Sequence, residues 1–455
     1  MWKNPRFLLH SCRSNLHQLW RRSFLSDSYS CQEIWDKRMT SPEFKSLKVA
    51  NLHYELDLQF SHFAKAPPVE VDMLVNLVRS EDSMDEVQDI LHKFRLSPET
   101  IDTLPSTHHG VIRYYLEVDH IKSLINILDD RLSYGIFPDD YLNNFLMDTF
   151  LKRKLYLEAA KVATNQALQE TYDHPISKYM GIYSCLKYLN EPSDWHVHDP
   201  VPEPEPEDDV KVKVRFLINP YFDDHFDLRQ PGDLIGKTFI FIGKGLKDPV
   251  GNSLILYGLV MRKKLEKAKG FADTLASGKE NVCGDVLTLV GEALNVEIAE
   301  AEKEEFEKKK SDLLESLKKI ENQTVPETLI SLVEGRLKDA VSKHEMNDIQ
   351  NQCKLYDQWE KDRVHLYLEL LEQRDRERRL AEVNNKLREL EEKEEELYYF
   401  QMKDKMEIQM EEKLKEIRKR EEKLQAIRKA EAEEYIPPEM PRTIGTPNEA
   451  PKQLT

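Results

Sequence analysis

Turn-like breaks in the helical pattern recur along the first half of the chain at nearly constant spacing. They limit the folds that the chain can adopt. Turn-like pairs stand at Pro67-Pro68, Leu104-Pro105, Pro138-Asp139 and His174-Pro175, and their prolines are 37, 33 and 37 residues apart. Each interval carries two helical patterns, since proline starts a helix readily but cannot continue one. The spacing is close to the roughly 34-residue period of tetratricopeptide-type hairpins, and about three such units suffice for a stacked solenoid.

The break YGIFPDD (134–140) shows how one unit passes into the next. Gly135 suits the left-handed backbone position just past a helix end, and Pro138 prevents the helix from continuing. Asp139 or Asp140 could then cap the following helix by accepting a hydrogen bond from its free N–H groups.

The sequence of this break resembles the pentatricopeptide repeat, whose consensus ends in Gly-Ile-x-Pro-Asp before an Asn-bearing apolar turn. The chain is similar in particular to the pentatricopeptide-type family of the mitochondrial ribosome's small subunit, the twenty-seventh in that subunit's naming series. YGIFPD, LMDTFLK, HKFRLSP and YFDDHFDL stand in the order and spacing of that family. The resemblance covers roughly residues 30–430, is dense over about 65–260, and implies a mainly α-helical solenoid of hairpins.

The N-terminus is basic, free of acids and amphipathic. Residues 1–24 hold five Lys and Arg residues among apolar residues and serines, and the first acid is Asp27. This pattern is typical of a mitochondrial transit peptide, and Arg22-Ser23-Phe24 before Leu25-Ser26 resembles a matrix-protease cleavage signal. Removal of 1–24 would lower the formal net charge from −17 to −22. A chain this acidic would not bind RNA through general phosphate attraction.

Composition changes mark further segments. No apolar run reaches the roughly 18 residues of a membrane span, and five cysteines without a CxxC pair argue against a zinc site and a disulfide framework. Strand-like VKVKVRFLI and GKTFIFIG predict a short β insert. The expected segments are a transit peptide (1–24), pentatricopeptide-like repeats (40–190), an acidic Pro-rich linker (191–209), the strand insert (210–250), a helical region (251–350), a long charged helix or coiled coil (355–435) and a disordered tail (436–455).

The charged helix carries a modest coiled-coil seam. Val383, Leu390 and Leu397 are seven residues apart, as are Met410, Ile417 and Leu424. The two series are 13 rather than 14 residues out of step, which predicts a discontinuity near YYFQMKDK. We expect this helix to dock one partner rather than to form a long rod.

Gly236-Lys237-Thr238 imitates the end of a phosphate-binding loop. Such a loop needs a glycine five residues before its second glycine, but Pro231 stands there and has no N–H to donate. Its threonine should also open a helix, whereas TFIFIG reads as a strand. We therefore expect a turn between strands and no nucleotide site.

No other cluster predicts catalysis, a cofactor or a metal site. His108 and His109 are neighbours that do not share a helix face, and His196 and His198 lie in the acidic linker without further ligands. YFDDHFD (221–227) gathers three aspartates and a histidine, but no nucleophile motif or glycine-rich loop accompanies it. We expect a capping loop there, and no enzyme.

Resemblance to RNA-reading pentatricopeptide proteins implies base-selecting pairs, here Asn144 with about Asp173 and His109 with Asp139. Two pairs cannot specify a site, because each base contact contributes about 1–3 kcal/mol. Residues 69–175 hold 10 Lys and Arg against 19 Asp and Glu, whereas a groove that follows single-stranded RNA should be basic. Besides Asn144, the RNA-contact candidates are two basic clusters that could equally be solvated faces: Lys152, Arg153, Lys154 and Arg262, Lys263, Lys264.

The resemblance implies a non-catalytic structural component of the mitochondrial small ribosomal subunit in the matrix. It would bind ribosomal RNA and neighbouring ribosomal proteins and support mitochondrial translation. An alternative keeps the fold but makes the chain a free mitochondrial RNA-binding factor, such as a translation activator or transcript stabiliser. If the basic N-terminus is not a transit peptide, a coiled-coil scaffold unrelated to RNA remains open.

Overall fold

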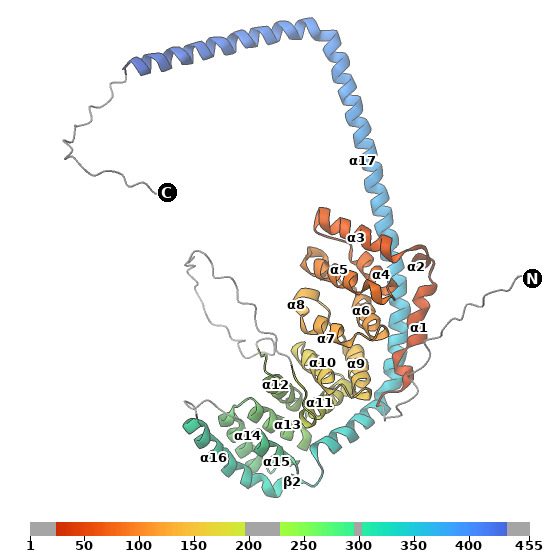
Figure 1. The fold of residues 1–455 in the computed structure, drawn as a ribbon, viewed down its shortest axis with the longest axis vertical. Coiled ribbons are helices and arrows are strands. Elements are labelled where there is room, and N and C mark those ends of the chain that lie inside the picture. The colour runs from red at the N-terminus through yellow and green to blue at the C-terminus, as the bar shows by residue number, and fades with distance from the viewer. Residues whose placement is uncertain (1–23, 196–227, 295–302, 435–455) are drawn as a thin grey trace, which may run out of the picture. The chain divides into compact units, whose positions relative to one another are not determined.

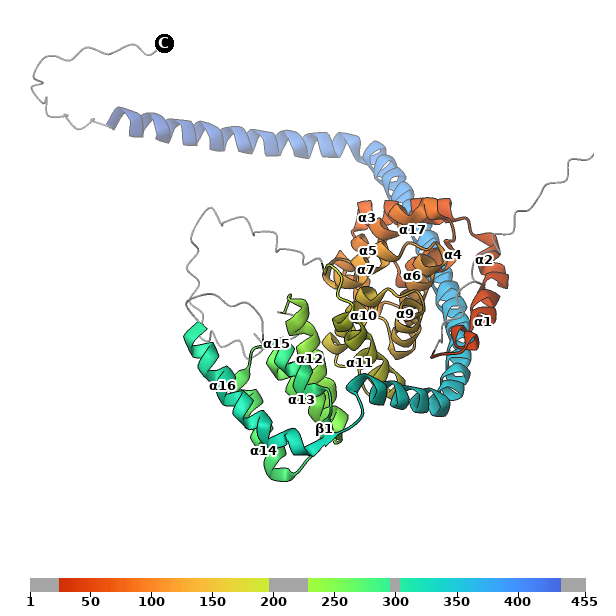
Figure 2. The same ribbon diagram turned by 60° about the horizontal axis from the view of Figure 1, so that its bottom comes forward.

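The computed structural model describes residues 24–195, 228–294 and 303–434, and these are mainly helical (Figures 1 and 2). They divide into two units, one ending at Leu368 and one beginning at Glu369. The helices of the first unit are α1 (Gln32–Lys37), α2 (Pro42–Ser46), α3 (Val49–Phe63), α4 (Pro68–Leu77), α5 (Met84–Leu96), α6 (Pro105–Glu117), α7 (Ile121–Asp129), α8 (Arg131–Tyr134), α9 (Asp140–Lys152), α10 (Tyr156–Leu168), α11 (Pro175–Asn190), α12 (Pro231–Lys244), α13 (Pro249–Met261), α14 (Leu265–Gly278), α15 (Val286–Ala293) and α16 (Lys303–Ile320). Helix α17 (Leu329–Glu434) belongs to both units.

The predicted breaks are helix starts. Pro68, Pro105 and Pro175 are the first residues of α4, α6 and α11. Each sits where its missing N–H costs no helical hydrogen bond. Each break is followed by two main helices, as predicted: α4 with α5, α6 with α7, and α9 with α10. The segment 42–63 forms two helices, α2 and α3, with Leu47 and Lys48 between them.

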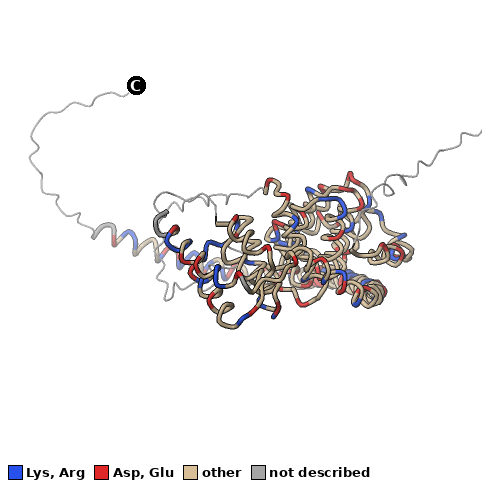
Figure 3. The backbone as a smooth tube through the Cα atoms, turned by 90° about the horizontal axis from the view of Figure 1, so that it is seen from below, with Lys and Arg blue, Asp and Glu red and all other residues tan. Residues whose placement is uncertain are grey.

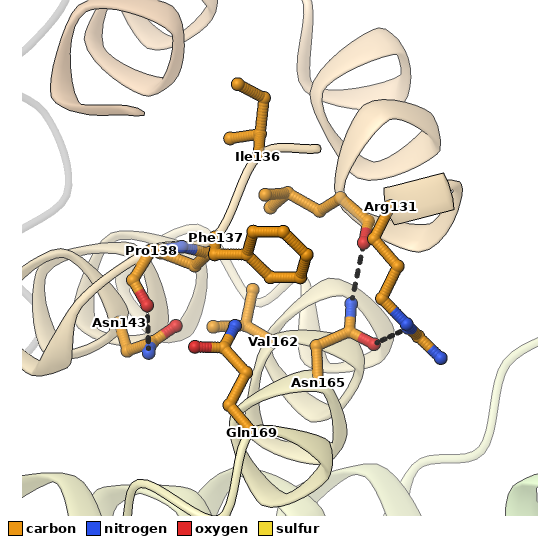
Figure 4. A pocket seen from close by; sticks show the side chains of 9 residues that line it. Arg131, Ile136, Phe137, Pro138, Asn143, Val162, Asn165 and Gln169 are labelled. Carbon is orange, nitrogen blue, oxygen red and sulfur yellow. Dashed lines mark hydrogen bonds between the residues drawn. The ribbon is translucent and has the colours of Figure 1, made fainter. Parts of the chain in front are cut away.

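The junction at 134–140 has the predicted geometry. Gly135 adopts a φ of +67°, and a Cβ there would meet the Arg95 side chain. Asp139 is the cap of α9, because its Oδ1 accepts a hydrogen bond from the Leu142 N–H at 2.8 Å. Figure 4 shows a small hollow behind this junction, in which the Asn143 side chain donates to the Pro138 carbonyl. Asn165 also bonds to its neighbours there, because its Nδ2 donates to the Leu128 carbonyl and its Oδ1 accepts from Arg131.

The strand predicted at GKTFIFIG is wrong, because these residues belong to α12. Pro231 opens the helix, and the buried residues Ile235, Phe239 and Ile242 follow a period of 3.6 rather than two. The Thr238 hydroxyl donates to the Leu234 carbonyl at 2.8 Å, a bond typical of threonine inside a helix. β-Branched and aromatic residues therefore do not indicate a strand in this segment. VKVKVRFLI and YFDDHFD lie outside the described residues.

Glycines allow α12 to pack closely against α13. A Cβ on Gly236 would lie 2.9 Å from the Gly258 carbonyl, and one on Gly243 would lie 2.9 Å from the Gly251 carbonyl. The two pairs bring α12 and α13 into close antiparallel contact. Gly236 of the phosphate-loop imitation is thus a packing residue within a helix.

The sheet in the described part of the chain is a pair of two-residue strands. Strand β1 (Val282–Cys283) pairs in parallel with β2 (Thr324–Val325), in the register Val282 to Thr324. This sheet lies outside the strand insert predicted at 210–250. It joins the start of α15 to the segment between α16 and α17.

The second unit consists, in its described part, of residues 369–434 of α17. The helix starts at Leu329, 26 residues before the predicted charged segment, and is continuous through YYFQMKDK. The coiled coil and its discontinuity therefore stay predictions. The tail at 436–455 lies outside the described residues.

Candidate nucleic-acid interface

Four residues stand fifth in the first helix of successive hairpins, and two of them, His109 and Asn144, are base-selecting candidates from the sequence. These residues are Asp72 of α4, His109 of α6, Asn144 of α9 and Tyr179 of α11. Asp72 and Asn144 are fully buried and His109 is 1% exposed, while Tyr179 is half-buried. Their partners show what covers them.

Asp72 is a buried carboxylate with a complete set of donors. Its Oδ1 accepts hydrogen bonds from the Ser106 and Thr107 hydroxyls at 2.6 and 2.8 Å. Its Oδ2 faces the Arg363 Nε of α17 at 2.6 Å. Because Arg363 is also buried, the pair is shielded from solvent, and Asp72 depends on Arg363 as its cation. Arg363 also pairs with Glu360.

His109 lies in an aromatic cluster formed with the same helix. Its Nδ1 lies 3.0 Å from the Tyr356 hydroxyl and its Nε2 lies 3.1 Å from Asp139 Oδ2. The Trp359 ring packs edge-on against the imidazole, with ring centres 4.8 Å apart. Burial lowers the pKa of His109, although the hydrogen bond to Asp139 opposes this. The predicted pair of His109 with Asp139 thus forms, but as an internal contact.

Asn144 is covered by the N-terminal segment, residues 24–41. Its side-chain amide donates to the Tyr29 hydroxyl at 3.3 Å, and the Tyr29 ring stacks on Tyr141 at 4.9 Å. Burial raises the pKa of Tyr29 well above its usual value, so the hydroxyl stays protonated. The RNA contact expected of Asn144 remains a prediction, and it requires displacement of Tyr29.

Helix α17 also contacts α11, the last of these four helices. His174, the cap residue of α11, places its Nε2 3.2 Å from Asp348. Arg336 lies within reach of the Tyr179 side chain and pairs with Asp248. Residues 336–363 of α17 therefore contact α4, α6 and α11 in reverse chain order, and Figure 1 shows this part of α17 running beside α4 and α6.

We call the surface formed by Asp72, His109, Asn144 and Tyr179 the inner row. Asp72, His109 and Tyr179 contact residues of α17, and Asn144 contacts the N-terminal segment. The two covering elements also contact each other, because the Ser26 N–H donates to Glu345 at 2.6 Å. The chain's own residues thus contact all four side chains of the inner row.

The two basic clusters form two turns of the same geometry. Lys154 and Lys263 both adopt a positive φ, at 60° and 55°, between the two helices of a hairpin. In the first turn Lys152 pairs with Asp148 at 2.8 Å and Arg153 pairs with Asp119. Lys154 and Lys263 are exposed, whereas Arg262 and Lys264 are half-buried. The structure therefore separates Lys154 and Lys263 from their neighbours as surface charges.

Charges of both signs alternate over the described chain. Figure 3 shows blue and red segments interspersed on the helices rather than gathered into one basic stripe in that view. This agrees with the acidic balance of residues 69–175. A long single-stranded RNA would find no continuous row of cations on this face.

Sequence reasoning missed the covering residues, although a signal for them was present. Tyr356, Trp359 and Arg363 lie three and four residues apart, so they share one face of a helix. Aromatic residues at that spacing inside a strongly charged stretch indicate a packed face. Their partners in α4 and α6 are 247 to 291 residues away and carry no mark of the pairing.

Two searches bear on other kinds of site. Within the residues that the structure describes, no three His, Cys, Asp or Glu side chains gather around one point as metal ligands would. No described helix combines the length and apolar character that crossing a bilayer requires. His196 and His198 lie outside the described residues.

Comparison with known families identifies the chain's relatives. The family model described as mitochondrial 28S ribosomal protein S27 matches residues 5–389. This match includes the hairpins, the N-terminal segment and the part of α17 that covers the inner row. It spans well over half of the 455 residues. The chain therefore belongs to the mitochondrial 28S ribosomal protein S27 family, as a protein of the mitochondrial small ribosomal subunit.

Proposed function

We propose that this chain is a non-catalytic structural component that binds ribosomal RNA and neighbouring ribosomal proteins without reading bases. The observation that carries the proposal is the internal occupation of the inner row, above all the contact of His109 with Tyr356 and of Asn144 with Tyr29. The hairpins would form a solenoid of pentatricopeptide type whose inner face serves folding. RNA contact would then fall to surface cations, and Lys154 and Lys263 are the best-placed candidates.

The second unit would make most of the contacts with neighbouring ribosomal proteins. Its apolar residues are exposed at heptad spacing, including Leu390 at 60% and Leu397 at 65%. Apolar side chains repeated along one helix are typical of a surface that a partner helix covers. The acidic linker at 191–209 would add further protein contacts.

Sedimentation of a mitochondrial extract tests this assignment against a free RNA-binding factor. We expect the chain to migrate with the small subunit. A stable pool at the top of the gradient, bound to messenger RNA, would instead support the free factor.

RNA contact can be tested within the assembled subunit. Lys154→Glu with Lys263→Glu should reduce ultraviolet crosslinking to ribosomal RNA several-fold while the chain still folds, because both side chains are exposed. The matched control is Lys48→Glu, another exposed lysine of the same unit. Crosslinks that persist unchanged in the double variant would contradict the contact.

A further inference from the structure

The first two described residues, Phe24 and Leu25, contact a buried carboxylate. The backbone N atoms of Phe24 and Leu25 lie 3.1 and 3.4 Å from Oδ1 of Asp148, on α9. Asp148 and the Leu25 side chain are each only 3% exposed. The Nζ of Lys152 lies 2.8 Å from the other carboxylate oxygen. A buried carboxylate of this kind favours a positively charged neighbour.

The sequence places a processing signal at the same residues. Arg22-Ser23-Phe24 followed by Leu25-Ser26 resembles a matrix-protease signal at the end of an acid-free, amphipathic presequence. The signal and the contact with Asp148 are independent observations. They coincide to within one residue.

We propose that a matrix protease hydrolyses the Phe24–Leu25 bond and that the new α-ammonium group of Leu25 pairs with Asp148. This inference rests on the transit peptide expected from the sequence and on the mitochondrial setting of the proposed function. Water supplies the hydroxyl group that makes Phe24 a carboxylate, and the Leu25 nitrogen takes up the protons that make it an ammonium. Peptide hydrolysis needs no oxidant or reductant.

Cleavage changes the electrostatics at Asp148. Before cleavage, the Leu25 group that faces the carboxylate is a neutral amide with one N–H. After cleavage it is a cation with three N–H donors, and charge-assisted hydrogen bonds are roughly twice as strong as neutral ones. The mature N-terminus is thus held more tightly than the same residues in the precursor.

The packing also sets the order of events. Leu25 is buried, and the Phe24 ring packs edge-on against Tyr183 with centres 5.0 Å apart. A protease needs an extended, accessible chain, so cleavage precedes docking of the segment. Docking then positions Tyr29 over Asn144, four residues from the new terminus. Processing in this way completes the cover of the inner row.

The first test maps the terminus of the protein recovered from mitochondria by mass spectrometry of its labelled N-terminal peptide. We expect the chain to start at Leu25. A start at Phe24 would mean cleavage one bond earlier and would overturn the proposed bond, even though that nitrogen lies 3.1 Å from Asp148 Oδ1. A start at any other residue overturns the proposal. This result does not depend on whether the chain sediments with the small subunit.

The second test measures the reactivity of the terminal amine towards an acylating reagent. In the native mature protein we expect labelling at least about tenfold slower than in the unfolded chain, which corresponds to one unit of pKa. Asp148→Asn should remove most of this protection, and Asp119→Asn should keep it because Asp119 is an exposed partner of Arg153. Equal labelling of native and unfolded wild-type protein overturns the ion pair, and this comparison holds even if the variant does not fold.

Discussion

The two parts of α17 share a helix but differ in what their side chains contact. Between 329 and 368, Val333, Leu337 and Arg363 are buried within the first unit. Between 369 and 434, Leu387 and Leu397 are 51% and 65% exposed, although they also recur at helical spacing. The first part therefore serves as a core element, whereas the second leaves its apolar residues exposed, where we propose that a partner binds. Apolar residues at similar helical spacing are therefore buried in the first part and exposed in the second.

Ion pairs offer the strongest contrast between the two parts. Arg363→Ala should lower the free energy of unfolding by about 3–5 kcal/mol, because it leaves Asp72 as a buried charge without its cation. Arg378→Ala, which breaks the exposed pair with Asp375, should cost less than about 1 kcal/mol. Denaturant titration of both full-length variants measures the difference. Equal costs would show that residues near 363 are not part of the core.

Acidification should weaken the first unit selectively. Burial lowers the pKa of His108 from 6.5 to about 4, so the unfolded chain takes up a proton between these values that the folded chain refuses. Stability from this histidine is therefore complete above pH 6.5 and falls as the pH drops towards 4, by on the order of 2 kcal/mol. Denaturation of wild type and His108→Asn at several pH values isolates this contribution. A difference between them that does not change with pH would contradict it.

Removal of one hydroxyl group tests the contact with His109. Tyr356→Phe removes the group that bonds to His109 and accepts a hydrogen bond from Arg113 at 3.0 Å. We expect a loss of about 1–2 kcal/mol. Tyr398→Phe is the matched control, since Tyr398 is 54% exposed on the second part of the same helix. It should leave the unfolding free energy unchanged.

The exposed seam should matter for assembly rather than for stability. Leu387→Asp with Leu390→Asp should change the unfolding free energy by no more than about 0.5 kcal/mol per site, as expected for exposed positions. The same double variant should lose most of its co-sedimentation with the small subunit. Arg388→Asp, on another face of the same turns, is the control. Retention of the double variant in the subunit would place its docking surface elsewhere.

Helix starts could be predicted from the sequence because they depend on local chemistry. Pro105 and Pro175 fix a backbone angle, and Asp139 accepts a hydrogen bond from a residue three positions away. Family membership followed from the same local motifs. Long-range pairing left no such trace, since Asp72 and Arg363 are 291 residues apart.

Neighbouring elements account for what local patterns leave out. The strand prediction for GKTFIFIG rests on its β-branched and aromatic residues, but the segment belongs to α12 and packs closely against Gly251 and Gly258 of α13. The RNA contact of Asn144 stays a prediction, and Tyr29 covers this residue in the structure. Local patterns encode neither neighbour.

The central claim is that the N-terminal segment and α17 lie together over the inner row, and disulfide trapping tests it most directly. The sulfur atoms of Cys31 and Cys353 are 3.7 Å apart, whereas Cys185 and Cys283 are fully buried elsewhere. Burial raises the pKa of Cys31 to about 11, so oxidation of the full-length chain is carried out in mildly alkaline buffer. We predict one crosslinked peptide pair that joins residues 31 and 353 and is absent from Cys353→Ser. Independent alkylation of both cysteines after oxidation, with no crosslink between them, would contradict the account.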